Sequence, residues 1–159
     1  MTKPRTRPTL AQARLKAEQY CAYQERCHKE VTQKLYNLGL AAEEVQDVLL
    51  HLMQHNFLNE ERFAKAFVRG KHKVLGWGRN KIVYHLKAKG INTKLIELAL
   101  QELNEQDYET ELRELIEKKN NLLKEEDNWK RMVKVSRYLS SKGYEPEQFM
   151  PVLKTFYGL

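Results

Sequence analysis

The chain has 159 residues, of which 42% are hydrophobic and 31% are charged, with only 7 glycines and 4 prolines. This composition is typical of a helix-rich soluble protein and excludes a disordered or fibrous chain. The formal net charge is +7, which favours a polyanion or an acidic protein surface as the partner.

The sequence shows no membrane or secretion signal. No apolar run approaches the roughly 20 residues that a membrane-spanning helix needs, so we expect no membrane contact. The stretch MTKPRTRPTL at the start is basic, but no apolar core follows it as it does in a secretion signal. We interpret residues 1–8 as a basic flexible tail and expect the protein in the cytoplasm.

Three similar phrases recur along the chain. KLYNLGL, HLKAKGI and YLSSKGY contain Gly39, Gly90 and Gly143, at spacings of 51 and 53 residues. A glycine that follows one helical pattern and precedes another is typical of a helix end, where it accepts a positive φ. We therefore expect these to be structural glycines, and the near-constant spacing indicates a repeated unit.

Hydrophobic residues keep the same phase relative to each glycine. Leucine stands four positions before each of the three glycines, at Leu35, Leu86 and Leu139. Leucine also stands ten positions after each glycine, at Leu49, Leu100 and Leu153. Any amphipathic helix–glycine–helix pair produces part of this pattern through its 3.6-residue period. The same phase three times over favours true repetition.

Each phrase also leaves room for one preceding helix, at roughly 9–23, 59–74 and 107–123. We predict an all-α protein of nine helices, arranged as three tandem three-helix units over residues 9–56, 57–104 and 105–159. One unit of about 50 residues buries too little apolar surface to be stable alone. The units should therefore stack into an elongated, solenoid-like body.

Several helix starts can be predicted. Asn59 and Asn92 are good N-cap residues, and Pro146 suits the first helical position after Glu145. Ala41 stands at the matching place in the first unit, two residues after its glycine. Because an alanine side chain accepts no hydrogen bond, we expect that helix start to be the weakest.

Positive charge is concentrated in the second unit, whereas residues 97–127 hold eleven acidic and four basic residues. Between positions 69 and 89 there is no Asp or Glu, and there are seven cations: Arg69, Lys71, Lys73, Arg79, Lys81, Lys87 and Lys89. Close like charges on a helix repel by a few tenths of a kcal/mol per pair. Without a nearby carboxylate, these side chains are expected to face phosphates or an acidic protein surface; the alternative is an ordinary solvated face.

Gly76, Trp77 and Gly78 separate the two basic segments. No strand precedes this turn and no Lys-Ser/Thr pair follows it, so it is not a phosphate-binding loop. Trp77 either packs at the turn between two helices or stacks on a nucleic-acid base, and we include it among the candidate binding residues.

The residues that could support chemistry are few. His51 and His55 share a helix face, but no HExxH motif or third ligand accompanies them. Cys21 and Cys27 lack CxxC spacing and a further ligand, so we interpret both as reduced structural residues. We expect no metal, no cofactor and no enzymatic activity.

The segment FLNEERFAKAFVRGKHKVLGWGRNKIVYHLKAKGI, residues 57–91, resembles the central signature of the RecX family, whose members regulate the RecA recombinase. The matching elements are Phe57 to Glu60, Arg62-Phe63-Ala64, Val68-Arg69, Gly76-Trp77-Gly78, Lys81-Ile82, Leu86 and Lys89-Gly90-Ile91. The family also has three tandem three-helix units, and at this level the resemblance extends from about residue 10 to 157.

The resemblance implies a regulatory protein without enzymatic activity that lodges in the helical groove of the RecA–DNA filament and bridges neighbouring subunits. It also implies inhibition of strand exchange, ATP hydrolysis and coprotease activity, together with some direct affinity for single-stranded or double-stranded DNA. We expect a monomer. Two alternatives remain: a stand-alone basic helical protein that binds nucleic acid without a recombinase, and a repeat adaptor for an acidic protein.

Overall fold

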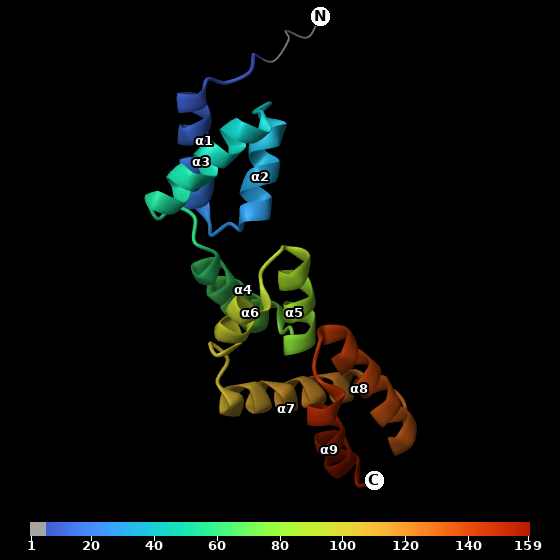
Figure 1. Cartoon of the computed structure of the whole chain (residues 1–159). Coiled ribbons are helices and arrows are strands. Elements are labelled where there is room, and N and C mark those ends of the chain that lie inside the picture. The colour runs from blue at the N-terminus through green and yellow to red at the C-terminus, as the bar shows by residue number, and fades with distance from the viewer. Residues whose placement is uncertain (1–5) are drawn as a thin grey trace, which may run out of the picture.

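The computed structural model describes residues 6–159, and over this range the chain forms nine α-helices and no strand (Figure 1). The helices are α1 (Leu10–Tyr23), α2 (His28–Asn37), α3 (Ala42–Gln54), α4 (Glu60–Leu75), α5 (Arg79–Ala88), α6 (Thr93–Leu100), α7 (Glu105–Leu122), α8 (Asn128–Lys142) and α9 (Pro146–Tyr157). They form three consecutive units, α1–α3, α4–α6 and α7–α9, which follow one another along an elongated body with the first and third units at opposite ends. The predicted all-α, three-unit architecture is confirmed.

The helices begin where side chains satisfy free backbone N–H groups. Asn59 accepts a hydrogen bond from the N–H of Arg62 at 2.9 Å, and Asn92 accepts one from Leu95 at 2.9 Å. Ala41 contributes no side-chain cap; instead the Glu44 carboxylate accepts a hydrogen bond from the Ala41 N–H at 3.1 Å. The start of α3 is therefore stabilised by the side chain of Glu44, the third residue of the helix, and not by an N-cap side chain.

Each unit has its own hydrophobic core. Buried Val31, Leu35 and Leu52 belong to the first core, Ile82 and Leu86 to the second, and a third core follows in α7–α9. The third core contains the largest fully buried side chains, among them Tyr108, Tyr144 and Phe149. Residues that keep the same phase relative to the glycines, such as Leu35, Leu86 and Leu139, are fully buried in all three cores.

The turns after α2, α5 and α8 contain the three predicted glycines. Gly39, Gly90 and Gly143 have φ values of 92°, 79° and 94°. An L-residue with a Cβ is strained in this left-handed region. The chain can therefore reverse sharply at these turns into the third helix of each unit.

Two joints connect the units. At the joint between the first and second units, Cys27 is fully buried in the second core, and Arg62 pairs with Glu25 at 2.6 Å. At the joint between the second and third units, the N–H of Gly78 donates to the carbonyl of Lys142 at 2.8 Å and the N–H of Asn80 donates to that of Gly143 at 2.8 Å. The second joint is thus formed by direct contact between backbones.

Part of the N-terminal tail expected over residues 1–8 lies outside the described residues, namely 1–5. Arg7, within the described part, forms an ion pair with Glu44 at the start of α3. Among residues 6–159, no helix combines the length and the apolar character that crossing a membrane requires.

Candidate basic binding face

The seven predicted cations lie on two consecutive helices of the second unit. α4 carries Arg69, Lys71 and Lys73 near its C-terminal end; Arg79, Lys81 and Lys87 belong to α5; and Lys89 caps the end of α5. Helix α4 ends because Gly76 adopts the left-handed conformation with φ 67°. The short Gly76–Gly78 connection brings the basic end of one helix next to the basic start of the other.

Trp77 is half-buried between these helices. Its ring centre lies 6.3 Å from that of Phe67, in an edge-on arrangement, and 4.6 Å from that of His85. The ammonium groups of Lys71 and Lys81 lie 5.3 and 4.8 Å from the ring centre, within cation–π range. Trp77 therefore packs at the turn, as one of the two interpretations predicted, and also supports two of the candidate lysines.

The expectation that all seven cations lack a carboxylate partner is wrong for three of them. Arg69 pairs with Glu102 at 3.3 Å, and Lys89 pairs with Glu30 at 3.6 Å. Arg79 pairs with Glu105 and with Glu145. Glu30 in α2, Glu105 in α7 and Glu145 before α9 belong to neighbouring units, and Glu102 lies in the turn after α6, so a search of the local sequence misses all four.

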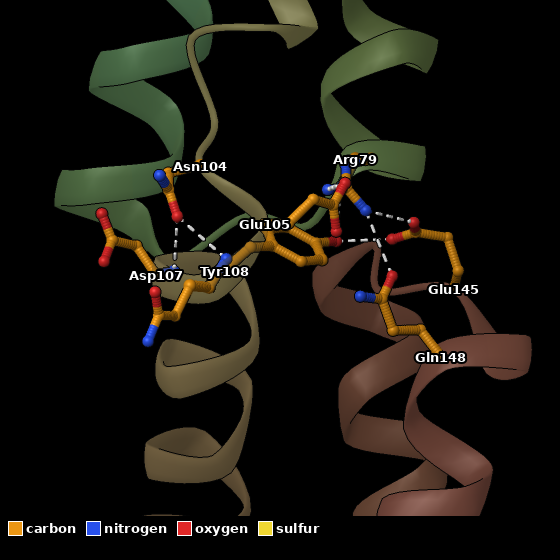
Figure 2. Close-up of polar contacts among 8 residues, drawn as sticks. Arg79, Asn104, Glu105, Asp107, Tyr108, Glu145 and Gln148 are labelled. Carbon is orange, nitrogen blue, oxygen red and sulfur yellow. Dashed lines mark hydrogen bonds and ion pairs between the residues drawn. The ribbon is translucent and has the colours of Figure 1, made fainter.

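Arg79 is the clearest correction, because its side chain is only 17% exposed. Figure 2 shows its guanidinium between Glu105 at the start of α7 and the pair Glu145 and Gln148 at the start of α9. The distances are 3.0 Å to Glu145 and 3.1 Å to Gln148, and the guanidinium carbon lies 3.9 Å from the centre of the Tyr108 ring. Arg79 thus links two units and is poorly placed to contact an external phosphate.

The groups around Arg79 are also hydrogen-bonded to one another. The Tyr108 hydroxyl donates to Glu145 at 2.5 Å and accepts from the N–H of Arg79 at 3.1 Å. Burial and the hydrogen bond to Glu145 raise the pKa of Tyr108 above its ordinary value. Burial lowers the pKa of Arg79, but its bonds to Glu105 and Glu145 outweigh that effect and leave the pKa raised. Both side chains therefore stay protonated at this joint.

His72 extends the same joint on the α4 side. It is 7% exposed, its ring lies 5.3 Å from that of Tyr108, and its Nδ1 lies 2.8 Å from the carbonyl oxygen of Trp77. Its Nε2 contacts the Glu111 carboxylate. The connection that carries Trp77 is thus anchored to the third unit.

Four cations remain without a carboxylate partner within residues 6–159: Lys71, Lys73, Lys81 and Lys87. Of these, Lys73 and Lys87 are exposed, and Lys71 and Lys81 are half-buried beside Trp77. We call these four residues the lysine face. The pKa of nearby His85 is lowered by burial and by Lys81, Lys71 and Lys89, so the face already disfavours a further positive charge.

The histidine and cysteine residues that the sequence offered as possible metal ligands pack or pair within the fold. His51 contacts Glu18 at 2.8 Å, and Cys21 and Cys27 are free and buried. Burial raises the pKa of both thiols to about 11. Residues 6–159 hold no cluster of three or more His, Cys, Asp or Glu side chains arranged for a metal.

Sequence reasoning missed the carboxylates and the ring that fix the joint, namely Glu105, Glu145 and Tyr108. They lie 26, 66 and 29 residues from Arg79, so no local pattern connects them. The one available signal was the position of Glu145 two residues after Gly143, where an N-cap is expected. Its carboxylate makes no cap in α9 and is free to reach Arg79.

The fold and the lysine face define a class: an all-helical protein of three tandem units whose middle unit carries four lysines without a carboxylate partner in the described part of the chain. Family models for the first, second and third three-helix domains of RecX match residues 13–52, 59–100 and 106–153. The chain belongs to the RecX family.

Individual relatives agree with this assignment. The chain is 34% identical to "Regulatory protein RecX" of Clostridium perfringens strain 13 over 119 residues, which are 74% of this chain and 55% of that protein. It is 34% identical to the protein of the same name from Clostridium beijerinckii over 128 residues, 79% of this chain and 59% of that one. The chain thus spans somewhat over half the length of these curated relatives.

A solved structure supports the fold. The crystal structure of RecX from Lactobacillus salivarius superposes with a TM-score of 0.83, covering 94% of this chain and 97% of that one, at 22% sequence identity. The match covers nearly all of the fold drawn in Figure 1.

Proposed function

We propose that this protein binds the RecA–DNA filament and modulates, mainly by inhibition, its recombinase, ATPase and coprotease activities. In this proposal it acts in the cytoplasm, as a monomer, without a cofactor and without catalysis of its own. The observation that carries the proposal is that all three units match RecX domains while the middle unit holds the four lysines of the lysine face.

The charge of the lysine face supports a polyanionic partner. Lys71, Lys73, Lys81 and Lys87 lie on two adjoining helices and have no carboxylate partner in the described part of the chain. A DNA phosphate or an acidic protein surface would relieve their mutual repulsion, and counterions released from DNA would add to the affinity. Arg69, Lys89 and Arg79 are already paired and contribute less.

The shape of the molecule supports a partner with a long groove. Helix α7 alone has 18 residues and therefore spans about 27 Å. The three units lie one after another, and the second joint is fixed by backbone hydrogen bonds and by Arg79 (Figures 1 and 2). A stiff body of this kind can contact several subunits of a filament at once.

The direct test is ATP hydrolysis by RecA on single-stranded DNA at substoichiometric addition of this protein. We expect strong suppression with far less than one molecule per RecA subunit, because one bound molecule affects several neighbours. Equal hydrolysis with and without the protein, at concentrations where it binds the filament, would contradict the proposal.

The alternative of a stand-alone nucleic-acid-binding protein predicts a different dose response. Passive coating of DNA suppresses hydrolysis only when the protein approaches saturation of the strand. Its affinity should also fall with salt at a log–log slope of roughly −0.7 per neutralised phosphate of single-stranded DNA, with or without RecA. Affinity that is much higher for the RecA filament than for bare DNA excludes this alternative.

A further inference from the structure

A continuous groove runs along the joint between the first and second units. Two adjoining cavities, of about 530 and 520 Å³, form it and share Glu30, His85 and Lys89. One extends toward Tyr20 on α1, and the other extends toward Trp77. Cavities of this size accept planar groups such as a nucleobase.

Three neighbouring aromatic rings, Phe67, Trp77 and His85, line this groove, and Tyr84 lies next to His85 just outside its lining. Phe67 and Trp77 have ring centres 6.3 Å apart, Trp77 and His85 are 4.6 Å apart, and His85 and Tyr84 are 5.5 Å apart. Tyr84, at the outer end, is 71% exposed. The Tyr84 ring is a flat surface that the fold does not cover, whereas the half-buried Trp77 ring has Lys71, Lys81 and His85 beside it.

Lysine ammonium groups surround these rings. Lys71 lies 5.3 Å from the ring centres of both Phe67 and Trp77, Lys81 lies 4.8 Å from that of Trp77, and Lys89 lies 5.9 Å from that of Phe67. A ligand that reaches the rings therefore meets positive charge on the way. This favours a ligand that combines a flat ring with a negative group.

Both carboxylates of the groove have a cationic partner, although the second oxygen of Glu25 is buried without a hydrogen bond within residues 6–159. Glu25 is bonded to Arg62 at 2.6 Å, and Glu30 lies 3.9 Å from Arg26 and 3.6 Å from Lys89. Lys71, by contrast, makes no carboxylate ion pair within residues 6–159. The groove therefore keeps uncompensated positive charge beside its rings.

We propose that this groove binds single-stranded nucleic acid by stacking unpaired bases on the Trp77–His85–Tyr84 series while the lysines contact the phosphates. The proposal deepens the DNA contact proposed above and rests on it. Stacking on aromatic side chains combined with a basic groove is the general mode of single-strand binding without sequence preference. A duplex is excluded from this mode because its bases are already stacked on one another.

An acidic peptide is the competing ligand, since it too would be attracted by the lysines. Such a peptide would not use the aromatic series, because its carboxylates bind to the lysine ammonium groups and not to the rings. Stacking and simple charge attraction can be distinguished by measurement. If bases stack on Trp77, a strand without bases loses the contact with Trp77; if charge alone drives binding, removal of the bases has no effect.

The experiment uses the whole chain with Trp129→Phe, which leaves Trp77 as the sole tryptophan. Trp129 is 61% exposed, so this change should not disturb the fold. We expect oligothymidylate of about 12 nucleotides to quench Trp77 fluorescence. An abasic strand of equal length and charge, and a duplex of equal length, should leave it unchanged.

A second variant tests the aromatic series at an exposed residue, outside the hydrophobic core. Tyr84→Ser removes an exposed ring, and we expect it to weaken oligothymidylate binding roughly fivefold without changing the affinity for the abasic strand. If oligothymidylate and the abasic strand bind equally and neither quenches Trp77, stacking is wrong but the proposed DNA contact survives. If no strand binds, both stacking and the DNA contact are wrong; RecA regulation is then judged by ATP hydrolysis alone.

Discussion

Gly78 and Gly143 meet backbone to backbone across the joint between the second and third units. A Cβ placed on Gly78 would lie 2.5 Å from the carbonyl carbon and oxygen of Gly143. A Cβ on Gly143 would in turn lie 2.5 Å from the backbone nitrogen of Lys81. Gly39 and Gly90 share the positive φ of Gly143 but make no comparably close approach to a backbone. Gly143 therefore has a second structural role besides its positive φ: its lack of a side chain allows the second and third units to pack backbone against backbone.

Gly78→Ala tests this contact. Because backbone atoms must move apart to admit the methyl group, we expect the free energy of unfolding to fall by about 1–3 kcal/mol, measured by urea denaturation followed by circular dichroism. Gly70→Ala is the matched control, since Gly70 is exposed in α4 and, apart from its chain neighbours and the backbone of its own helix, nothing in the described part of the chain lies within 4 Å of the added carbon. That control should be stabilised by about 0.5–1 kcal/mol. Equal behaviour of the two variants would refute the close docking.

Arg79→Ala tests the polar part of the same joint. The change leaves the half-buried Glu145 without its cation, and we expect a loss of about 1.5–3 kcal/mol, as for a hydrogen bond to a charged group. Arg79→Lys should recover only part of this, because an ammonium cannot reproduce the forked contacts to Glu145 and Gln148. Urea midpoints give both values.

Arg113→Ala serves as the control for Arg79. Arg113 pairs with Glu109 at 3.0 Å, but the two side chains are 60% and 52% exposed, so its loss should cost below about 0.5 kcal/mol. A cost for Arg79→Ala as small as that for Arg113→Ala would show that Arg79 does not hold the units together.

Acid sensitivity of the first unit should depend on Glu44. The hydrogen bond from the Ala41 N–H, and then the contact with Arg7, lower the pKa of Glu44. A carboxyl with a depressed folded-state pKa stabilises the fold above its unfolded value of about 4.3, and this contribution is lost as the pH falls through the folded pKa. Glu44→Gln should therefore lose less stability than the wild type between neutral and acid pH.

Glu43→Gln is the control, because Glu43 is exposed and makes no ion pair or side-chain hydrogen bond within residues 6–159. Its urea midpoint should fall with pH in parallel with the wild type. A parallel fall in Glu44→Gln would mean that the Ala41 and Arg7 contacts do not matter for stability.

The sequence predicted the architecture well because the signals that set it are local. Periodic apolar residues, N-caps at Asn59 and Asn92, and a glycine at each turn all act within a few residues of one another. The same phase relative to Gly39, Gly90 and Gly143 then implied one three-helix unit repeated three times.

The roles of individual cations were less predictable, because they depend on contacts distant in sequence. Arg79 and Lys81 look alike in a basic segment, yet Arg79 meets carboxylates of the third unit, whereas Lys81 lies over Trp77. Lys89 is likewise neutralised by Glu30 of the first unit. Local charge density located the basic segment of the middle unit but could not separate the unpaired lysines from the cations held in ion pairs.

The central claim is that uncompensated lysines of the middle unit contact the filament. The most direct measurement compares RecA ATP hydrolysis on single-stranded DNA with two charge-reversed variants of equal net charge. One carries Lys71→Glu, Lys73→Glu and Lys87→Glu; the other carries Lys118→Glu, Lys124→Glu and Lys154→Glu, at exposed positions of the third unit. We predict that the first variant, with unchanged helical circular dichroism, no longer suppresses hydrolysis, whereas the second suppresses it like the wild type. Full suppression by the first variant would contradict the account.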